Sequence, residues 1–281
     1  MLTAMRGYVE LMRPLNCCIA AAAILAGAVV AVGFAALGGS AWQVAVAVVV
    51  GALFTGAGNA LNDYYDRHVD EMNHPARPIP SGRVSAPRAL KFAAVLFVIA
   101  LVLGILAGWL ALLVVIINLA AMISYELHFK RKGSSGNVII GWLVASLFIF
   151  GGAAAFNGSA QALSRVSWMG LLAFLATVGR EILKDIEDVA GDIDRRTLPM
   201  VIGVEKAGFL AATAFVLSVA LSPLPFFTNV LGMPYLAVVT LADVIFIYCA
   251  WISTANPTLA SRAAKYGMVV ALFAFLAGGA P

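Results

Sequence analysis

The sequence predicts an all-α membrane protein, with nine transmembrane helices in a single bundle and one domain over residues 1–281. Hydrophobic residues make up 62% of the 281 residues and charged residues only 11%, and the mean hydropathy is +0.97. A soluble domain carries about 25% charged residues. The apolar residues form long runs instead of the alternating pattern of an outer-membrane barrel. Helices satisfy their own backbone hydrogen bonds within lipid, so these runs indicate spanning helices.

The apolar runs divide into nine predicted spans. A helix needs about 20 apolar residues to cross the hydrocarbon core, and charged residues, Gly and Pro mark the ends of each run. The first run, 15–37, is longer than the core of a signal peptide and further runs follow, so we expect it to be the first span. The others are predicted at 42–62, 89–109, 111–129, 137–157, 166–184, 206–226, 234–253 and 264–280. Only Gly108 and Trp109 divide the third span from the fourth.

The charged residues support a count of nine. With nine spans, all of the 18 Lys and Arg residues except Arg165 fall on the same side as the N-terminus. Positively charged loops face the cytoplasm, so a multi-pass protein of the cell membrane with a cytoplasmic N-terminus is predicted. All of the 14 acidic residues except Asp243 lie on this side too, which suggests a cytoplasmic active site. Asp243 lies mid-span, where a functional carboxylate and a helix–helix hydrogen bond are equally plausible.

Two aspartate clusters share one spacing. Each places carboxylates at i, i+3 and i+7: Asp63, Asp66 and Asp70 after the second span, and Asp185, Asp188 and Asp192 after the sixth. On a continuing helix this spacing puts all three carboxylates on one face. Their flanks correspond as well, so residues 62–80 and 184–199 form a degenerate parallel repeat on one side of the membrane.

The clusters predict a metal site. Like charges stacked on one helix face are destabilising unless a cation neutralises them. Mg²⁺ prefers oxygen ligands, and usually takes one or two carboxylates together with water and substrate phosphate. A single cluster would equally suit a solvated helix end, but the repeated spacing favours Mg²⁺ bridged by a diphosphate.

A diphosphate also needs cations around it. Lys130, Lys184 and Arg67 are near the acids in the sequence, and we expect them to bind the diphosphate. Some other bases are expected to act only as topology determinants, namely Arg83, Arg88, Arg262 and Lys265.

These motifs resemble the UbiA superfamily of intramembrane prenyltransferases over nearly the whole chain. The family signatures are an NDxxDxxxD segment and a DxxxD segment, and the stretch from Tyr125 to Lys130 resembles its tyrosine-to-lysine segment. The resemblance implies that Mg²⁺ is held by Asn62, Asp66, Asp188 and Asp192. It implies catalytic roles, by ligation or by pairing with a base, for Asp63, Asp70 and Asp185, and a further one for Tyr125.

Three stretches, 11–17, 77–82 and 179–188, resemble family members that form the second ether of archaeal lipids. Those enzymes move a geranylgeranyl group onto the free hydroxyl of geranylgeranylglyceryl phosphate. The implied substrate-binding residues are Arg13, Asn16, Arg67, Arg77, Lys130 and Lys184. The sequence departs from that pattern in a shorter segment from Asp192 to Thr197 and in His74, where Arg is expected. The expected partners are a prenyl diphosphate donor, a prenylglyceryl phosphate acceptor and membrane lipids, with no nucleic acid.

The parts suggest how the reaction proceeds. Neutralising the leaving diphosphate lets the allylic C–O bond ionise. The ring of Tyr64, Tyr65 or Tyr125 is expected to stabilise the allylic cation, unless these are interfacial aromatics. Asp63 or Asp70 is expected to take the proton of the acceptor.

Two other functions stay open from the sequence. An aromatic prenyltransferase of quinone, haem or chlorophyll biosynthesis would use the same metal site, but a 4-hydroxybenzoate-type acceptor needs no extra bases. A transporter is the more remote alternative. Its ion sites lie near the bilayer midplane on broken helices, whereas these acids end helices on one side.

Overall fold

The computed structural model describes residues 2–130, 132–156, 158–189 and 196–279. The first half contains α1 (Leu2–Met12), α2 (Pro14–Ala36), a 3-10 turn η1 (Leu37–Ser40), α3 (Ala41–Asn73), α4 (Ala86–Leu106), α5 (Trp109–Ser124) and a π-helical turn η2 (Tyr125–Phe129). The second half contains α6 (Ser135–Ala154), α7 (Ala160–Asp188), α8 (Leu198–Ile202), α9 (Val204–Leu221), α10 (Leu224–Phe227), α11 (Met233–Ile252) and α12 (Pro257–Gly278). Two short strands, β1 (Lys132–Gly133) and β2 (Arg196–Thr197), complete the secondary structure of the described residues.

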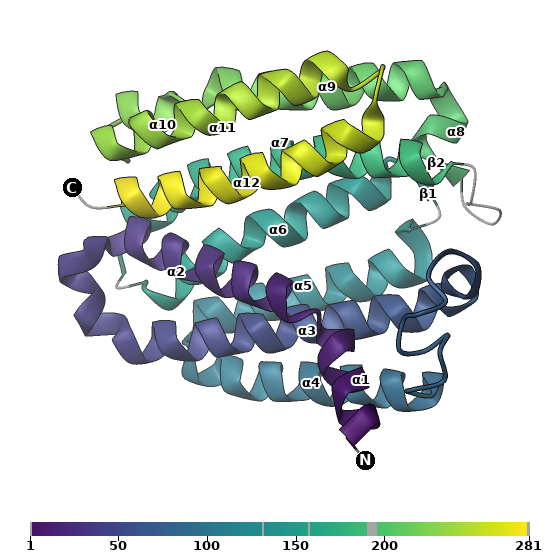
Figure 1. Ribbon diagram of the computed structural model, residues 1–281. Helices are drawn as coiled ribbons and strands as arrows, with labels where there is room; N and C mark the ends of the chain where they lie inside the picture. Colours follow the sequence, from purple (N-terminus) through teal and green to yellow (C-terminus); the bar gives the residue numbers. More distant parts are fainter. Residues whose placement is uncertain (1, 131, 157, 190–195, 280–281) are drawn as a thin grey trace.

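The helices confirm the all-α prediction. Eight helical stretches of the described residues are long and apolar enough to cross a membrane. The first of them, Pro14–Asn73, has 60 residues, which is about 90 Å at 1.5 Å per residue and far more than one bilayer. It consists of α2 and α3, which turn back on each other at η1 and pack side by side (Figure 1).

The helix boundaries differ from the predicted ones where charge follows a span. Gly108 lies at φ 109°, a conformation open to glycine, and it separates α4 from α5 as predicted. In contrast, α3 continues to Asn73 and α7 to Asp188, so the predicted ends at 62 and 184 were too early. Hydropathy marks where the apolar run stops, and these helices extend beyond that point. Both acid clusters therefore begin on helices.

The helices form one bundle around closely packed central elements. α2 packs against α3 and α6, α6 against α7, and α12 against α7, α11 and α2. A Cβ added at Gly27 of α2 would overlap the backbone of Phe148 in α6, and one at Gly151 of α6 would overlap that of Ile24 in α2. Small residues are what allow transmembrane helices to approach so closely.

One end of the bundle collects the elements that carry charge. β1 and β2 pair in parallel, with Lys132 opposite Arg196, and so join the connection before α6 to the one before α8. In Figure 1 these strands lie toward the right-hand side, as do the last turns of α3 and the start of α12. The end of α7 and the first turns of α12 thus lie at the same end of the bundle as the end of α3, although the three segments are distant in sequence.

Candidate active site

One cavity of about 1030 Å³ opens within the bundle, with lining residues from α2, α3, α6, α7, α11 and α12. Its mouth is polar and includes Asp66 and Asp188, one from each acid cluster. Further in, the lining is mainly apolar, with Phe54, Leu172 and Phe275. Phe54 and Asp66 are separated by about 18 Å along α3, at 1.5 Å per residue. The cavity therefore joins a charged mouth to a long apolar interior.

Two carboxylates of the first cluster are bound by arginines. Asp63 is 3% exposed, and its Oδ1 lies 2.5 Å from Nη2 of Arg13 and 3.6 Å from Nη1 of Arg77. Asp70 is 4% exposed and accepts a hydrogen bond of 2.6 Å from Nη1 of Arg77. Arg13 and Arg77 therefore neutralise these two stacked acids. Pairing with a basic residue is one of the roles that the resemblance implied for Asp63 and Asp70.

Arg13 reaches Asp63 from an unusual backbone conformation. It lies between α1 and α2 in the left-handed region, at φ 52° and ψ 74°. Such a conformation costs a non-glycine residue about 1–3 kcal/mol and is found mostly at functional sites. Nδ2 of Asn59 donates a hydrogen bond of 2.9 Å to the Met12 carbonyl and so holds this junction against α3.

Asp66 is bound by a lysine instead. Nζ of Lys130 lies 2.9 Å from a carboxylate oxygen of Asp66 and 2.9 Å from one of Glu126. The π-helical turn η2 is closed by a backbone hydrogen bond from Lys130 to Tyr125. π-Helical turns frequently occur at functional sites. Here the turn directs Tyr125 and Lys130 to the cavity wall.

The second cluster is only partly described. Nδ2 of Asn137 donates a hydrogen bond of 2.8 Å to Asp185, while Asp188 lines the cavity at the last residue of α7. Asp192 lies outside the described residues, so the repeat of 62–80 in 184–199 remains a prediction. One turn before Asp185, Glu181 pairs with Arg180 at 2.8 Å and with Lys184 at 2.9 Å.

The remaining predicted substrate-binding residues divide into two groups. Arg13, Asn16, Arg77, Lys130 and Lys184 line the cavity. Arg67 is not among the described lining residues, and its guanidinium hydrogen-bonds the Tyr64 carbonyl at 2.8 Å and covers the Tyr64 ring at 4.7 Å.

The predicted metal ligand Asn62 lines the cavity and donates a hydrogen bond of 3.0 Å to Glu126. Of the three candidate tyrosines, Tyr125 is the one among the described lining residues. The Tyr64 and Tyr65 rings contact each other edge to face with centroids 5.3 Å apart. The geometry therefore favours Tyr125 as the ring that faces a reacting group.

Sequence reasoning missed Glu126. Its side chain is fully buried and it binds both Lys130 and Asn62, which belong to different helical elements. A signal was present, because a carboxylate at the end of an apolar run, four residues before a lysine, predicts a pair on one helical face. Asn137 carries no such signal, since nothing local in the sequence relates it to Asp185.

The donor set suits a hard divalent cation. Within the described residues no three His, Cys, Asp or Glu side chains are gathered closely enough to hold a metal by themselves. Mg²⁺ does not require such a cage, because one or two carboxylates together with substrate phosphates usually bind it. Asp66 and Asp188, which line the mouth of one cavity, supply such a pair of carboxylates. The residues present therefore fit Mg²⁺ that binds with a diphosphate.

Asp243 lines the same cavity. It accepts a hydrogen bond of 2.7 Å from the Ser222 hydroxyl, and Tyr235 donates one of 2.6 Å to the Ser222 carbonyl. Both groups belong to helices in the membrane part of the bundle. The contact links α11 to the end of α9, as expected for a helix–helix hydrogen bond.

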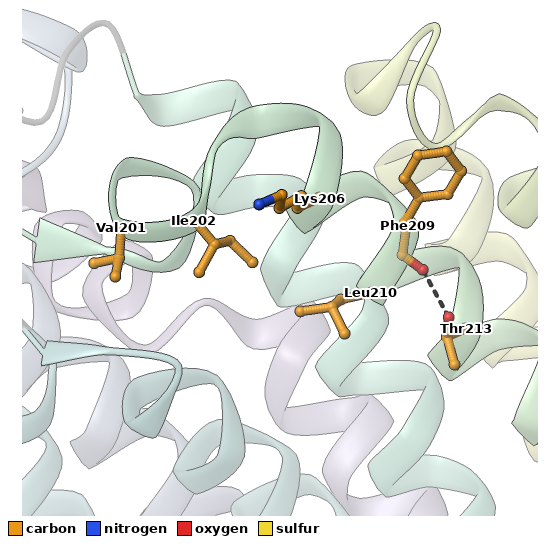
Figure 2. A pocket seen from close by; sticks show the side chains of 6 residues that line it. All are labelled: Val201, Ile202, Lys206, Phe209, Leu210 and Thr213. Carbon is orange, nitrogen blue, oxygen red and sulfur yellow. Dashed lines mark hydrogen bonds between the residues drawn. The ribbon is translucent and has the colours of Figure 1, made fainter.

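A second hollow of about 570 Å³ is formed by α8 and α9 (Figure 2). Its described lining is mainly apolar, with Lys206 as the charged member. The hydroxyl of Thr213 there donates to the carbonyl of Phe209 in its own helix at 2.8 Å. No carboxylate is among these lining residues, so the hollow does not resemble a diphosphate site.

Known proteins resemble this chain over nearly its whole length. Residues 20–277 match the UbiA prenyltransferase family. The chain is 41% identical to digeranylgeranylglyceryl phosphate synthase of Natronomonas pharaonis, over 97% of this chain and 96% of that protein. It is 39% identical to the synthase of Methanosarcina mazei, over 97% and 98%.

Solved structures give the same picture. A structure from work on digeranylgeranylglyceryl phosphate synthase in membranes aligns over 98% of each chain, with a TM-score of 0.80 and 31% identity. A UbiA homologue from Archaeoglobus fulgidus bound to GPP and Mg²⁺ shares the fold at a TM-score of 0.59 and 16% identity, over 94% of this chain and 99% of that chain. The likeness thus extends over nearly the entire bundle.

Proposed function

Because this chain belongs to the UbiA prenyltransferase family, it is an intramembrane prenyltransferase, and we propose that it acts as a digeranylgeranylglyceryl phosphate synthase. The reaction transfers a geranylgeranyl group from geranylgeranyl diphosphate to the free hydroxyl of geranylgeranylglyceryl phosphate. The observation that carries this proposal is a cavity that joins Asp66 and Asp188, one residue from each acid cluster, to an apolar interior. Relatives named for this activity, at about 40% identity over nearly the full chain, support it.

The donor binds with its diphosphate at the mouth and its hydrocarbon chain inside. Asn62, Asp66, Asp188 and Asp192 would hold Mg²⁺, in line with the Mg²⁺ and GPP bound to a protein of the same fold. When bound, Mg²⁺ neutralises the negative charge that develops on the leaving diphosphate. Lys130, held between Asp66 and Glu126, contributes a further positive charge there.

One bond breaks and one bond forms in the reaction, and donor and acceptor are the only reactants needed. The C–O bond between the prenyl carbon and the diphosphate breaks, and the acceptor oxygen forms the new ether bond to that carbon. The hydroxyl proton passes to Asp70, which lines the cavity and stays oriented by Arg77. A weak base suffices, because attack on an allylic cation makes the attacking hydroxyl strongly acidic. The face of the Tyr125 ring stabilises that cation.

The membrane placement is part of the proposal. We infer nine crossings, because α2 and α3 each exceed the length that a span needs. The N-terminus and the mouth of the cavity then face the cytoplasm, where nearly all Lys and Arg residues lie.

A product assay tests the proposal. The purified protein in lipid nanodiscs receives Mg²⁺ and geranylgeranyl diphosphate, with either geranylgeranylglyceryl phosphate or 4-hydroxybenzoate as acceptor. We expect mass spectrometry to find the diether phosphate, together with released diphosphate. A prenylated 4-hydroxybenzoate formed in place of the diether would contradict the proposed acceptor.

A further inference from the structure

Two basic residues that sequence reasoning assigned to topology lie in the cavity. Arg262 and Lys265, in the first turns of α12, are among the residues that line it. Arg88 and Lys91 have the same i, i+3 spacing at the start of α4, yet they are not among the described lining residues. Topology alone therefore accounts for the α4 pair and leaves the placement of the α12 pair unexplained.

The other bases of the mouth have acidic partners. Arg77 binds Asp70, and Lys130 binds Asp66. Arg180 and Lys184 share Glu181. Each of these cations is therefore at least partly neutralised within the protein.

Arg262 and Lys265 differ from these bases. Neither makes an ion pair or a hydrogen bond to another described side chain. On α7, which packs against α12, the buried Nε of Arg180 has no hydrogen-bond partner among the described residues. A buried N–H group without an acceptor destabilises the folded protein. Binding of a ligand that accepts a hydrogen bond from this group is therefore favoured. This side of the mouth thus offers unused positive charge.

The same face of α12 continues into the apolar interior. After Arg262 and Lys265, the lining residues include Met268, Leu272 and Phe275, at helical spacing. From Arg262 to Phe275 this face is about 20 Å long, at 1.5 Å per residue. A cationic head followed by an apolar stripe is complementary to an amphiphile with an anionic head and an isoprenoid tail.

We propose that Arg262 and Lys265, with Nε of Arg180, form a second anion site that binds the phosphate monoester of the acceptor. The site is separate from the acid clusters, which hold the diphosphate of the donor. A phosphate monoester carries a charge of about −1.5 to −2 and three acceptor oxygens, and arginine can bind such a group with two parallel hydrogen bonds. Anchored there, the acceptor directs its hydroxyl into the cavity and its chain along α12. This inference rests on the proposed function.

A double variant and a matched control test the site. Arg262→Gln/Lys265→Gln removes both charges, and Arg88→Gln/Lys91→Gln removes the same charge with the same spacing outside the cavity. We expect the first variant to raise KM for geranylgeranylglyceryl phosphate by about 10–100-fold, because charged hydrogen bonds are lost. KM for geranylgeranyl diphosphate should stay close to the wild-type value. The control variant should keep both KM values.

Two further measurements separate recognition of phosphate from folding. The wild-type enzyme should prefer the phosphorylated acceptor to phosphate-free geranylgeranylglycerol, and Arg262→Gln/Lys265→Gln should lose that preference. The charge-conserving variant Arg262→Lys/Lys265→Arg should regain most of it. Phosphatidylglycerol in the nanodisc should not compete with the acceptor, since a phosphodiester offers fewer free oxygens.

The outcomes distinguish the inference from the function on which it rests. An unchanged acceptor KM in Arg262→Gln/Lys265→Gln, with active wild-type enzyme, overturns the second site and leaves the proposed function standing. A raised KM for the donor in place of the acceptor overturns it as well, as does competition by phosphatidylglycerol that the variant abolishes. If wild-type enzyme forms no diether phosphate at all, the proposed function fails.

Discussion

Arg13 and Asp63 are 50 positions apart in the sequence and are joined by a hydrogen bond of 2.5 Å between Nη2 and Oδ1. Asp63 is almost fully buried, and its second cation, Arg77, is 3.6 Å away. The pair fixes the junction of α1 and α2 against α3. It also sets this aspartate apart from Asp66, which faces the cavity in the same motif.

Removing this ion pair should mainly lower the stability of the folded protein. Arg13→Gln leaves a buried carboxylate without its nearer partner, and we expect a loss of about 1–3 kcal/mol in the free energy of unfolding. Thermal unfolding in detergent measures it. Arg88→Gln, an exposed arginine on α4, serves as the control and should melt like the wild type. An unchanged melting temperature for Arg13→Gln would show that the pair does not stabilise the bundle.

Asp66 and Asp188, the two acidic residues among the proposed metal ligands that line the cavity, should behave in the opposite way. Asp66→Asn or Asp188→Asn keeps the shape of the side chain and removes a charge from the Mg²⁺ site, so kcat/KM should fall about 100-fold or more at saturating Mg²⁺. The melting temperature should change little. Glu71→Gln, at an exposed position of the same helix, is the control. Wild-type turnover in either variant would reject the assignment of the metal site.

Glu126 should act through the residues that it orients. Glu126→Gln keeps the size of the side chain but weakens its hold on Lys130 and Asn62. Loss of such supporting contacts typically costs about 10–100-fold in activity or metal affinity. We expect the Mg²⁺ concentration for half-maximal activity to rise by that order. Glu205→Gln on α9 provides a control, and an equal response in both variants would contradict the positioning role.

The close contact between α2 and α6 depends on a glycine, Gly151. Gly151→Ala adds a methyl group that would collide with the Ile24 carbonyl, and overpacking of this kind costs about 1–3 kcal/mol. Gly170→Ala is the matched control, because its nearest neighbour would be an ordinary contact at 3.5 Å. Thermal unfolding should separate the two variants. Equal melting temperatures would mean that α2 and α6 can move apart without cost.

The ion pair between Glu10 of α1 and Arg83 of the α3–α4 connection should depend on pH. Hydrogen bonds from Arg83 lower the pKa of the Glu10 carboxyl below its usual value. A carboxyl whose pKa is lower in the folded state contributes stability above its unfolded pKa, near 4.3, and loses it as pH falls through the folded value. The protection factors of the amides in α1, which are corrected for the intrinsic pH dependence of exchange, should therefore be constant above about pH 4.3 and fall below it. Glu10→Gln should remove this dependence, and a loss of protection at low pH that persists in the variant would assign it to another group.

Local sequence determined the helices and the spacing of their acids. Apolar runs and the residues that interrupt them set where the spans begin, including the break at Gly108. The i, i+3, i+7 spacing placed Asp63, Asp66 and Asp70 on one side of α3, because helical periodicity relates residues that are close in the chain. The UbiA resemblance followed from such short motifs.

Tertiary structure alone decided which charges meet. Arg13 joins Asp63, Lys130 joins Asp66, and Arg262 reaches the cavity because helices distant in sequence pack together. No local period relates these positions. The acid spacing therefore predicted a cation site, while the packing of α3, α7 and α12 decided which bases neutralise the acids and which remain for a substrate.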